Sequence, residues 1–284
     1  MPPTLTRRHF LAATAGALGA ATLGDGFLVE PTAIDVTRHD VPIPGLPAAL
    51  DGVRIACLTD THLHGGISGA ARAALEHLDR ERPEIVVLVG DICNKSGDLP
   101  TLTAWARDAR GTVATFATYG NWEHAAEIDR ASAEVAYGKA GVEFLCNAAA
   151  RVTIRGATLT ILGLDDPVEG RPDPMAALAD VGARDIAVWA LHGPGYVDEL
   201  PKNLAPRPAL FLAGHTHGGQ IRLPGITPVL PVGSGRFVAG WYRHTLAPLY
   251  VSRGIGTVFV PARLFCPPEL PVFSLRSSLH QLTP

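Results

Sequence analysis

The sequence has few cysteines, no run of basic residues and no marked excess of either charge. Its 284 residues contain four widely spaced cysteines without a Cys-x-x-Cys motif, which argues against an iron–sulfur or other thiolate metal site. Lysine and arginine number 24 against 27 aspartates and glutamates, so the formal net charge is −3. With so little positive charge, we expect no nucleic acid partner and no general attraction to anionic lipid. Any affinity for phosphate must therefore come from a local site and not from the overall charge of the protein.

Internal repeats, coiled-coil heptads and low-complexity linkers are also missing, so a single large catalytic domain is the simplest organisation. Cys57 and Cys93 lie in or beside apolar runs, and we expect both to be free, buried thiols. An exported protein is permitted disulfides, and the sequence alone pairs none of the four cysteines.

What the sequence does contain is a set of seven side chains of metal-binding type, in five short segments that mostly follow apolar runs. They are Asp60, His62, Asp91, Asn121, His192, His215 and His217. The ends of strands in an α/β sheet deliver ligands into one crevice, so residues far apart in sequence are expected to converge there. Carboxylate and imidazole ligands suit Mn²⁺, Zn²⁺ or Fe, whereas Mg²⁺ and Ca²⁺ prefer oxygen alone.

Each of these segments alone has an ordinary interpretation. Asp-x-His and Gly-Asp are common turn sequences, and a lone His192 is most often a core or loop histidine. The order of the segments favours a metal site over these ordinary interpretations, because apolar runs end at Thr59, Val89 and Tyr119 immediately before candidate ligands. The Gly-His-Thr-His-Gly-Gly run at residues 214–219 is stronger still, since histidines clustered between glycines have little structural use. Together the segments predict a two-metal hydrolase site.

In this order the motifs Asp-x-His, Gly-Asp, Gly-Asn, His and Gly-His-x-His resemble those of calcineurin-like metallophosphoesterases, over most of residues 50–276. The resemblance implies an α/β fold, a four-layer α-β-β-α sandwich of two mixed sheets like that of metallo-dependent phosphatases. It also implies the division of ligands: Asp60, His62 and His217 bind one metal, Asn121, His192 and His215 bind the other, and Asp91 bridges both. Residues 249–257 and 266–270 are similar to the exported bacterial phosphodiesterase branch, some relatives of which act on lipid-linked sugar diphosphates.

The predicted function is hydrolysis of a phosphodiester or diphosphate outside the cytoplasm, by in-line attack of a hydroxide that bridges two divalent metal ions. Asp91 is expected to be catalytic as the shared ligand, and Asn121 as a donor to the developing negative oxygen. The substrate is predicted to be a small phosphorylated molecule or a lipid or cell-envelope phosphodiester. A phosphomonoesterase and a catalytically silent metal-binding protein stay open as alternatives.

The sequence departs from the family at Trp122, where relatives carry a histidine near the phosphoryl oxygens. An indole N–H only donates, so Trp122 cannot replace an imidazole. We hypothesise that His124 substitutes in part, or that the leaving group needs no acid; the alternative for His124 is an exposed residue in the first turn of a helix. His64 and Arg253 are predicted to bind substrate, with a solvated loop residue and a structural salt bridge as their respective alternatives.

The chain start resembles a twin-arginine export signal. Arg7 and Arg8 precede an Ala- and Gly-rich stretch to Gly24 that is only mildly apolar and shorter than a membrane-spanning helix. We therefore expect a signal segment at 1–24, a lead-in at 25–49 and a metallophosphoesterase domain at 50–284. The twin-arginine export machinery would be a partner, and the location periplasmic or on the extracytoplasmic face of the membrane. Whether the segment is cleaved is left open; an uncleaved segment would hold the enzyme at the membrane. The alternative to an export signal is an ordinary frayed N-terminus.

Periodicity predicts the elements between these motifs. Buried strands are expected at 53–59, 85–89, 113–118, 186–191 and 210–213, and closely linked antiparallel strands at 142–145, 151–154 and 159–164. Helices are expected from residue 69 with Ser68 as cap, from 98–100 to 111, and over 123–139. The Pro- and Gly-rich stretch at 221–240 is expected to be a surface loop over the site.

Overall fold

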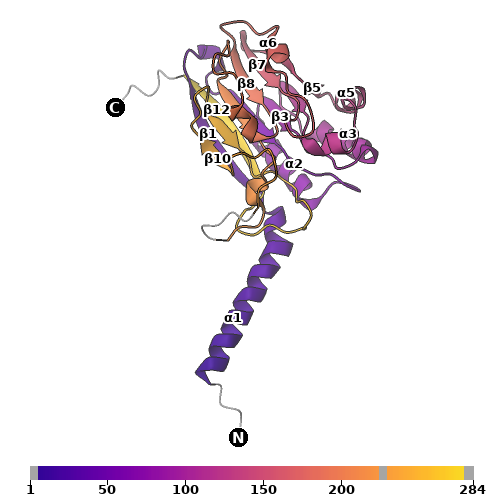
Figure 1. Cartoon of the computed structure of the whole chain (residues 1–284), viewed down its shortest axis with the longest axis vertical. Helices are drawn as coiled ribbons and strands as arrows, with labels where there is room; N and C mark the ends of the chain where they lie inside the picture. The colour runs from indigo at the N-terminus through magenta and orange to yellow at the C-terminus, as the bar shows by residue number, and fades with distance from the viewer. Residues whose placement is uncertain (1–5, 224–228, 278–284) are drawn as a thin grey trace, which may run out of the picture.

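Two six-stranded mixed sheets form the body of the protein, shown in Figure 1. The computed structural model describes residues 6–223 and 229–277. The first sheet has the order β1 (Asp35–Ile43), β12 (Glu269–Ser277), β2 (Arg54–Leu58), β3 (Ile85–Val89), β4 (Ala114–Thr118) and β5 (Glu143–Phe144). The second has the order β10 (Gly240–Tyr242), β11 (Leu249–Val251), β9 (Leu210–Ala213), β8 (Ile186–Ala190), β7 (Ala157–Gly163) and β6 (Ala148–Ile154).

The apolar run of β3 shows how the layers are built. Its five residues are all buried, as expected of a parallel strand that is covered on both faces. Ile85, Val87 and Val89 pack in the core between the two sheets, whereas Val86 and Leu88 pack in the core beneath the helices. Because side chains alternate along a strand, one continuous apolar run supplies both cores.

Three helices cover the outer face of the first sheet: α2 (Gly69–Glu81), α3 (Leu99–Asp108) and α5 (Arg130–Lys139). Ser68 caps α2 as predicted, with its hydroxyl accepting from the Ala71 N–H at 3.1 Å. The outer face of the second sheet carries only the short α6 (Pro174–Leu178), the 3-10 turn η5 (Pro194–Asp198) and loop residues. The predicted four-layer sandwich is therefore confirmed, with one thin outer layer.

Two predicted elements are wrong in detail. The helix expected over 123–139 is broken into α4 (Asn121–Ala125) and α5, because Glu127 has a left-handed backbone (φ 54°) and Asp129 caps a new start by accepting from the Ser132 N–H. Strand β5 does not join an antiparallel ribbon with β6, but pairs in parallel with β4 in the other sheet. Strands β6 and β7 do pair antiparallel, as predicted. The loop predicted at 221–240 lies partly outside the described residues.

The chain before residue 50 contributes both a strand and an exposed helix. Strand β1 pairs with β12 along nine residues, so the first sheet begins before the domain boundary that the sequence predicts. Helix α1 (Arg7–Gly24) has no buried residue and stands away from the sheets in Figure 1. The helical run Arg7–Thr32 is long and apolar enough to cross a membrane, a property that signal sequences share. Two turns, η1 (Asp25–Val29) and η2 (Glu30–Thr32), extend it beyond the mildly apolar segment visible in the sequence.

We predict that Trp105→Ala lowers the free energy of unfolding by about 3–5 kcal/mol. Trp105 is fully buried in α3, and its Nε1–H donates to the Ala71 carbonyl at 3.1 Å, so the substitution leaves a cavity and removes this hydrogen bond. Denaturant unfolding followed by circular dichroism measures the change. Trp105→Phe, which keeps most of the volume, should lose less, and equal losses in the two variants would contradict the cavity explanation.

Candidate metal centre

The structure brings the seven predicted ligands together at the ends of five strands. Asp60 and His62 follow β2, Asp91 follows β3, Asn121 opens α4 after β4, His192 follows β8, and His215 and His217 follow β9. All but Asn121 are buried. Their ligand atoms form two groups that could each hold a metal ion, one of Asp60, His62 and His217 and the other of Asp91, His192 and His215. For these six residues the grouping agrees with the predicted division, in which Asn121 joins His192 and His215 and Asp91 bridges both metals.

Distances between the ligand atoms fit shared ions. The Nε2 atoms of His62 and His217 are 3.1 Å apart, and Nε2 of His217 is 3.4 Å from Oδ1 of Asp60. Ligand bonds of about 2.0–2.1 Å, at angles between square and tetrahedral, separate neighbouring donor atoms by about 2.9–3.4 Å. Oδ2 of Asp91 lies 3.1 Å from Nε2 of His192 and 3.8 Å from Nε2 of His62, so Asp91 stands between the groups. This is the position expected of a bridging carboxylate.

Hydrogen bonds fix which nitrogen of each imidazole faces the site. His62 donates from Nδ1 to Oδ1 of Asn94 at 2.8 Å, and His192 donates from Nδ1 to the Val89 carbonyl at 2.8 Å, which leaves Nε2 free in both. His215 donates from Nε2 to the Val232 carbonyl at 2.6 Å, so its Nδ1 is the free nitrogen. Partners of this kind orient metal-binding histidines and raise their basicity as ligands.

For three of the ligands, burial and neighbouring charges favour the protonation state that binds metal. Burial, together with the adjacent imidazole of His62, keeps the pKa of His217 well below its ordinary value, so this side chain is neutral. Burial and then His192 lower the pKa of His215 in the same way. For Asp91 burial acts in the opposite direction, but the imidazoles of His192 and His62 outweigh it and lower the pKa, so the carboxyl is ionised.

The backbone at the site adopts unusual conformations. Asp60, His62, Asp91, His215 and His217 all have φ between 48° and 72°. Such left-handed conformations are uncommon for residues other than glycine and gather at functional sites. The neighbouring glycines are needed for space, because a Cβ at Gly120 would lie 2.2 Å from Asp91 Oδ1 and one at Gly214 would lie 2.5 Å from Asp60 Oδ2.

Two buried ligand atoms, Asn121 Oδ1 and His192 Nε2, lack a hydrogen-bond partner among the described residues, and so does Nδ1 of His217, the ring nitrogen that faces away from its ligand group. Buried polar atoms are almost always paired, so these atoms require a partner from outside the chain. Two carboxylates, one amide oxygen and four imidazoles form a donor set that suits Mn²⁺, Zn²⁺ or Fe. The residues therefore fit a binuclear metal site.

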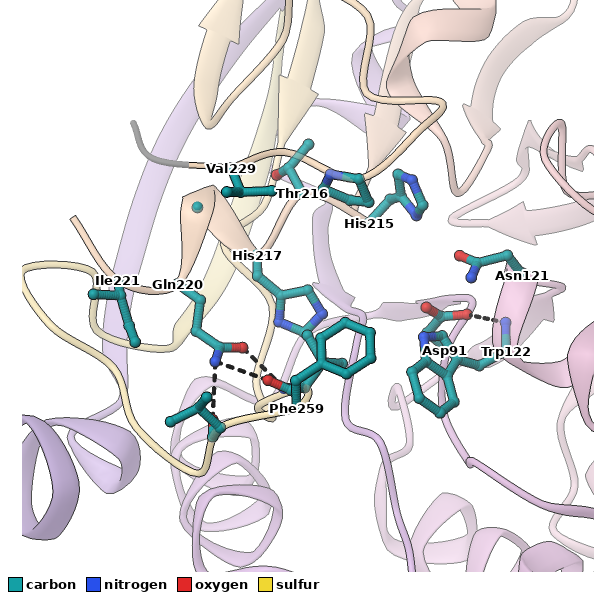
Figure 2. A pocket seen from close by; sticks show the side chains of 14 residues that line it. Asp91, Asn121, Trp122, His215, Thr216, His217, Gln220, Ile221, Val229 and Phe259 are labelled. Atoms are coloured by element: carbon teal, nitrogen blue, oxygen red, sulfur yellow. Dashed lines mark hydrogen bonds between the residues drawn. The ribbon is translucent and has the colours of Figure 1, made fainter. Parts of the chain in front are cut away.

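The site opens into a cavity of about 550 Å³, shown in Figure 2. Four of the candidate ligands line it: Asp91, Asn121, His215 and His217. The remaining walls are largely apolar, formed by Trp122, Thr216, Gly219, Gln220, Ile221, Val229, Pro231, Val258, Phe259 and Val260. Trp122 thus lies against the ligands, with its ring 5.2 Å from that of His62.

Glu123 is a functional residue that the sequence reasoning missed. Its buried carboxylate accepts from the N–H groups of Gly120 and Asp91 on one oxygen and of Ile92 and Cys93 on the other. Burial, and then repulsion from Asp91, raise the pKa of Glu123. Glu123 thus joins the two loops that carry Asp91 and Asn121. The sequence signal that could have identified Glu123 was an acidic residue three positions after Gly120, at the start of a helix.

The three remaining predicted residues lie outside the cavity lining. His124 bonds through Nε2 to Asp165 Oδ1 at 2.7 Å, and this bond raises the pKa of His124 against the effect of burial. His64 bonds through Nδ1 to Asp98 at 2.9 Å. Arg253 pairs with Glu269 at 3.3 Å and with Asp35 at 2.6 Å, which is the salt-bridge alternative. Roles for these residues with substrate stay predictions.

All four cysteines are buried and free, which confirms the prediction for Cys57 and Cys93 and extends it to Cys146 and Cys266. Burial raises the pKa of each thiol, most strongly for Cys57 and Cys93. Thiols of this kind are poor nucleophiles, so the chemistry of the site does not use them.

Comparison with known proteins identifies the family. The sequence profile described as "Calcineurin-like phosphoesterase" matches residues 53–219, from the start of β2 to the end of the His-x-His turn. The chain belongs to this family. The protein is therefore a metal-dependent phosphoric ester hydrolase, and its two ligand groups could hold the metal ions of a binuclear site.

Similar proteins come from several organisms. The uncharacterized metallophosphoesterase YkuE of Bacillus subtilis is 28% identical over 295 residues, which cover 96% of this chain and 99% of that protein. Phosphodiesterase YaeI of Escherichia coli is 28% identical over 285 residues, covering 95% of this chain and 99% of that one. A zebrafish "transmembrane protein with metallophosphoesterase domain" is 26% identical, over 82% of this chain and 55% of its own length.

We predict that Glu123→Gln lowers both stability and metal content. One end of a glutamine amide is a donor, so in either orientation it would face two backbone N–H groups, at a cost of about 1–3 kcal/mol or more. Thermal unfolding and elemental analysis of the purified protein measure the two effects. The exposed Glu127→Gln is the matched control, and a Glu123→Gln protein with unchanged stability would show that the carboxylate is dispensable.

Proposed function

We propose that the protein is a phosphodiesterase that acts outside the cytoplasm. The observation that carries the proposal is the convergence of seven candidate ligands, six of them buried and forming two groups with Asp91 between them, next to a cavity large enough for one substituent of a diester. The similarity to a protein named phosphodiesterase along nearly its whole length supports the diester class. The apolar helix at the chain start, with Arg7 and Arg8 in its first turn, supports export through the twin-arginine machinery.

Two divalent ions held by these ligands, Mn²⁺, Zn²⁺ or Fe, supply an activated water for in-line attack and neutralise the phosphate oxygens. The chain provides the rest. Asp60 is fixed by the His215 N–H at 3.0 Å and Asp91 by the Trp122 N–H at 2.8 Å, so the carboxylates are positioned before substrate arrives. The amide of Asn121, in the lining of the cavity, is placed to donate to an oxygen that gains negative charge.

Trp122 favours diesters over monoesters. It occupies the cavity wall where relatives place an imidazole, and it brings an apolar ring against which the second substituent of a diester would pack. A phosphomonoester has no such substituent and carries one more charge, which an apolar wall disfavours. The complete ligand set, in turn, argues against a catalytically silent metal-binding protein.

We predict that Asp91→Asn lowers turnover of bis-p-nitrophenyl phosphate by more than about 100-fold, because Asp91 stands between both groups. The variant should also lose metal. Chelation of the unmodified protein should abolish activity, and Mn²⁺ or Zn²⁺ should restore it. The exposed Asp108→Asn is the control. Full activity of Asp91→Asn, or activity that survives complete removal of metal, would overturn the two-metal proposal.

The hypothesis that His124 supplies a proton to the leaving group has a separate test. If it does, His124→Gln should slow diesters with alkyl leaving groups far more than those with p-nitrophenolate, because only poor leaving groups need an acid. The measurement is kcat across leaving groups of rising pKa, with His77→Gln in α2 as control. An unchanged rate on the poorest leaving group would assign His124 to the hydrogen bond with Asp165 alone.

A further inference from the structure

The cavity wall and the base of helix α1 form one continuous structure. Residues 258–260 line the cavity, and a few residues later the same segment binds the turn after α1. The Arg263 N–H donates to the Gly26 carbonyl at 2.9 Å, and the Phe265 N–H donates to the Glu30 carboxylate at 2.9 Å. We call residues 258–266 the strap. The mouth of the active site is therefore held beside the base of the exposed apolar helix.

A second segment ties the cavity to the strap. The side chain of Gln220 donates to the carbonyls of Val258 and Val260 and accepts from the Val258 N–H. Backbone pairing continues from Ile221 to Leu264, and the Arg222 N–H donates to the Leu264 carbonyl at 2.8 Å. Both cavity walls are bonded to the strap, and the strap is bonded to the turn after α1. The cavity mouth therefore lies in the same surroundings as the base of α1.

The surface around the mouth is apolar and exposed. Phe259 is 93% exposed, Leu28 80% and Phe265 56%. Figure 2 shows Phe259 at the cavity beside His217, and its ring lies 6.1 Å from that of Trp122. Exposed apolar groups gathered at one place on a soluble surface usually mark an interaction site.

Backbone conformation singles out the two phenylalanines of the strap. Phe259 (φ 59°) and Phe265 (φ 53°) both have left-handed backbones, which for a bulky side chain is a clear outlier. Conformations of this kind cost of order 1–3 kcal/mol each and persist where they serve a function. Glycine or asparagine would be favoured at both positions if folding were the only requirement. At both positions the strained backbone instead exposes an aromatic ring.

We propose that the strap and the turn after α1 dock into the surface of a lipid bilayer, so that the metal centre opens toward the membrane. The continuity with α1 identifies the partner as lipid, because none of the eighteen residues of this helix is buried and most of them are apolar. Phenylalanine rings at the mouth enter the boundary between headgroups and acyl chains. The apolar cavity then receives the chain of an amphiphilic phosphodiester whose phosphate reaches the ligands; this second step rests on the proposed function.

Site-directed fluorescence tests the docking. Because the four native cysteines are buried, a single thiol introduced by Phe259→Cys or Phe265→Cys takes an environment-sensitive label selectively. Met175→Cys is the control, since Met175 is 65% exposed in α6, which Figure 1 shows at the end of the domain remote from α1. The full chain is reconstituted into vesicles of phosphatidylcholine and phosphatidylglycerol that contain spin-labelled lipid.

Labels at 259 and 265 should shift to shorter wavelength and lose at least half of their emission to the spin labels, whereas the label at 175 should do neither. Equal wavelength shifts and equal quenching at all three positions would overturn the docking proposal and would indicate that α1 only tethers the enzyme to the membrane. A wavelength shift without quenching by lipid would overturn it as well, and would indicate a protein partner or a second copy of the chain.

A chain-length series tests the substrate step without any membrane. For p-nitrophenyl alkyl phosphodiesters below their micelle concentration, kcat/KM should rise at least tenfold from methyl to octyl, as burial of several CH₂ groups allows. Equal values along the series, with bis-p-nitrophenyl phosphate still hydrolysed, would reject the amphiphilic substrate alone. No hydrolysis of any diester would reject the proposed function, while the fluorescence result would still decide the docking.

Discussion

Two carboxylates and four imidazoles share one buried space, and this concentration of ionisable groups constrains the rest of the structure. Burying such groups costs several kcal/mol each unless charges and hydrogen bonds compensate. The fold compensates in part with backbone N–H groups directed at Asp60 and Asp91 and with carbonyls that orient the histidines. Divalent cations bound by the two ligand groups would complete the compensation. The five segments that carry the seven ligands thus surround one site, and the two sheets hold the ends of these segments in place.

Most of this centre could be predicted from the sequence, because its signals are local. Each ligand follows an apolar run, and strands such as β3 and β9 begin and end where the runs do. The grouping of His217 with Asp60 and His62 was available only through the family resemblance, since no spacing in the chain places residues 60 and 217 together. Ser68 was equally predictable, because a cap precedes its own helix.

The features that could not be predicted depend on tertiary contacts. Two loops meet around Glu123, and no sequence pattern near Glu123 indicates that Asp91 is its neighbour in the fold. Strand β5 has only two residues, too few for a pattern to decide which sheet it joins. The break between α4 and α5 depends on the left-handed Glu127, a conformation that its side chain does not favour. Helix α1 continues past Gly24 because the turns after it are fixed by the strap, more than 200 residues away along the chain.

The pairing of β1 with β12 links the first strand of the sandwich to its last. Asp35 lies opposite Glu269 and Ile43 opposite Ser277, and β12 separates β1 from β2 in the sheet. Contacts between such distant segments form late and make folding slow. A ribosome would have to synthesise the chain as far as β12 before this sheet could close. Any translocation of the folded enzyme would have to wait for that strand.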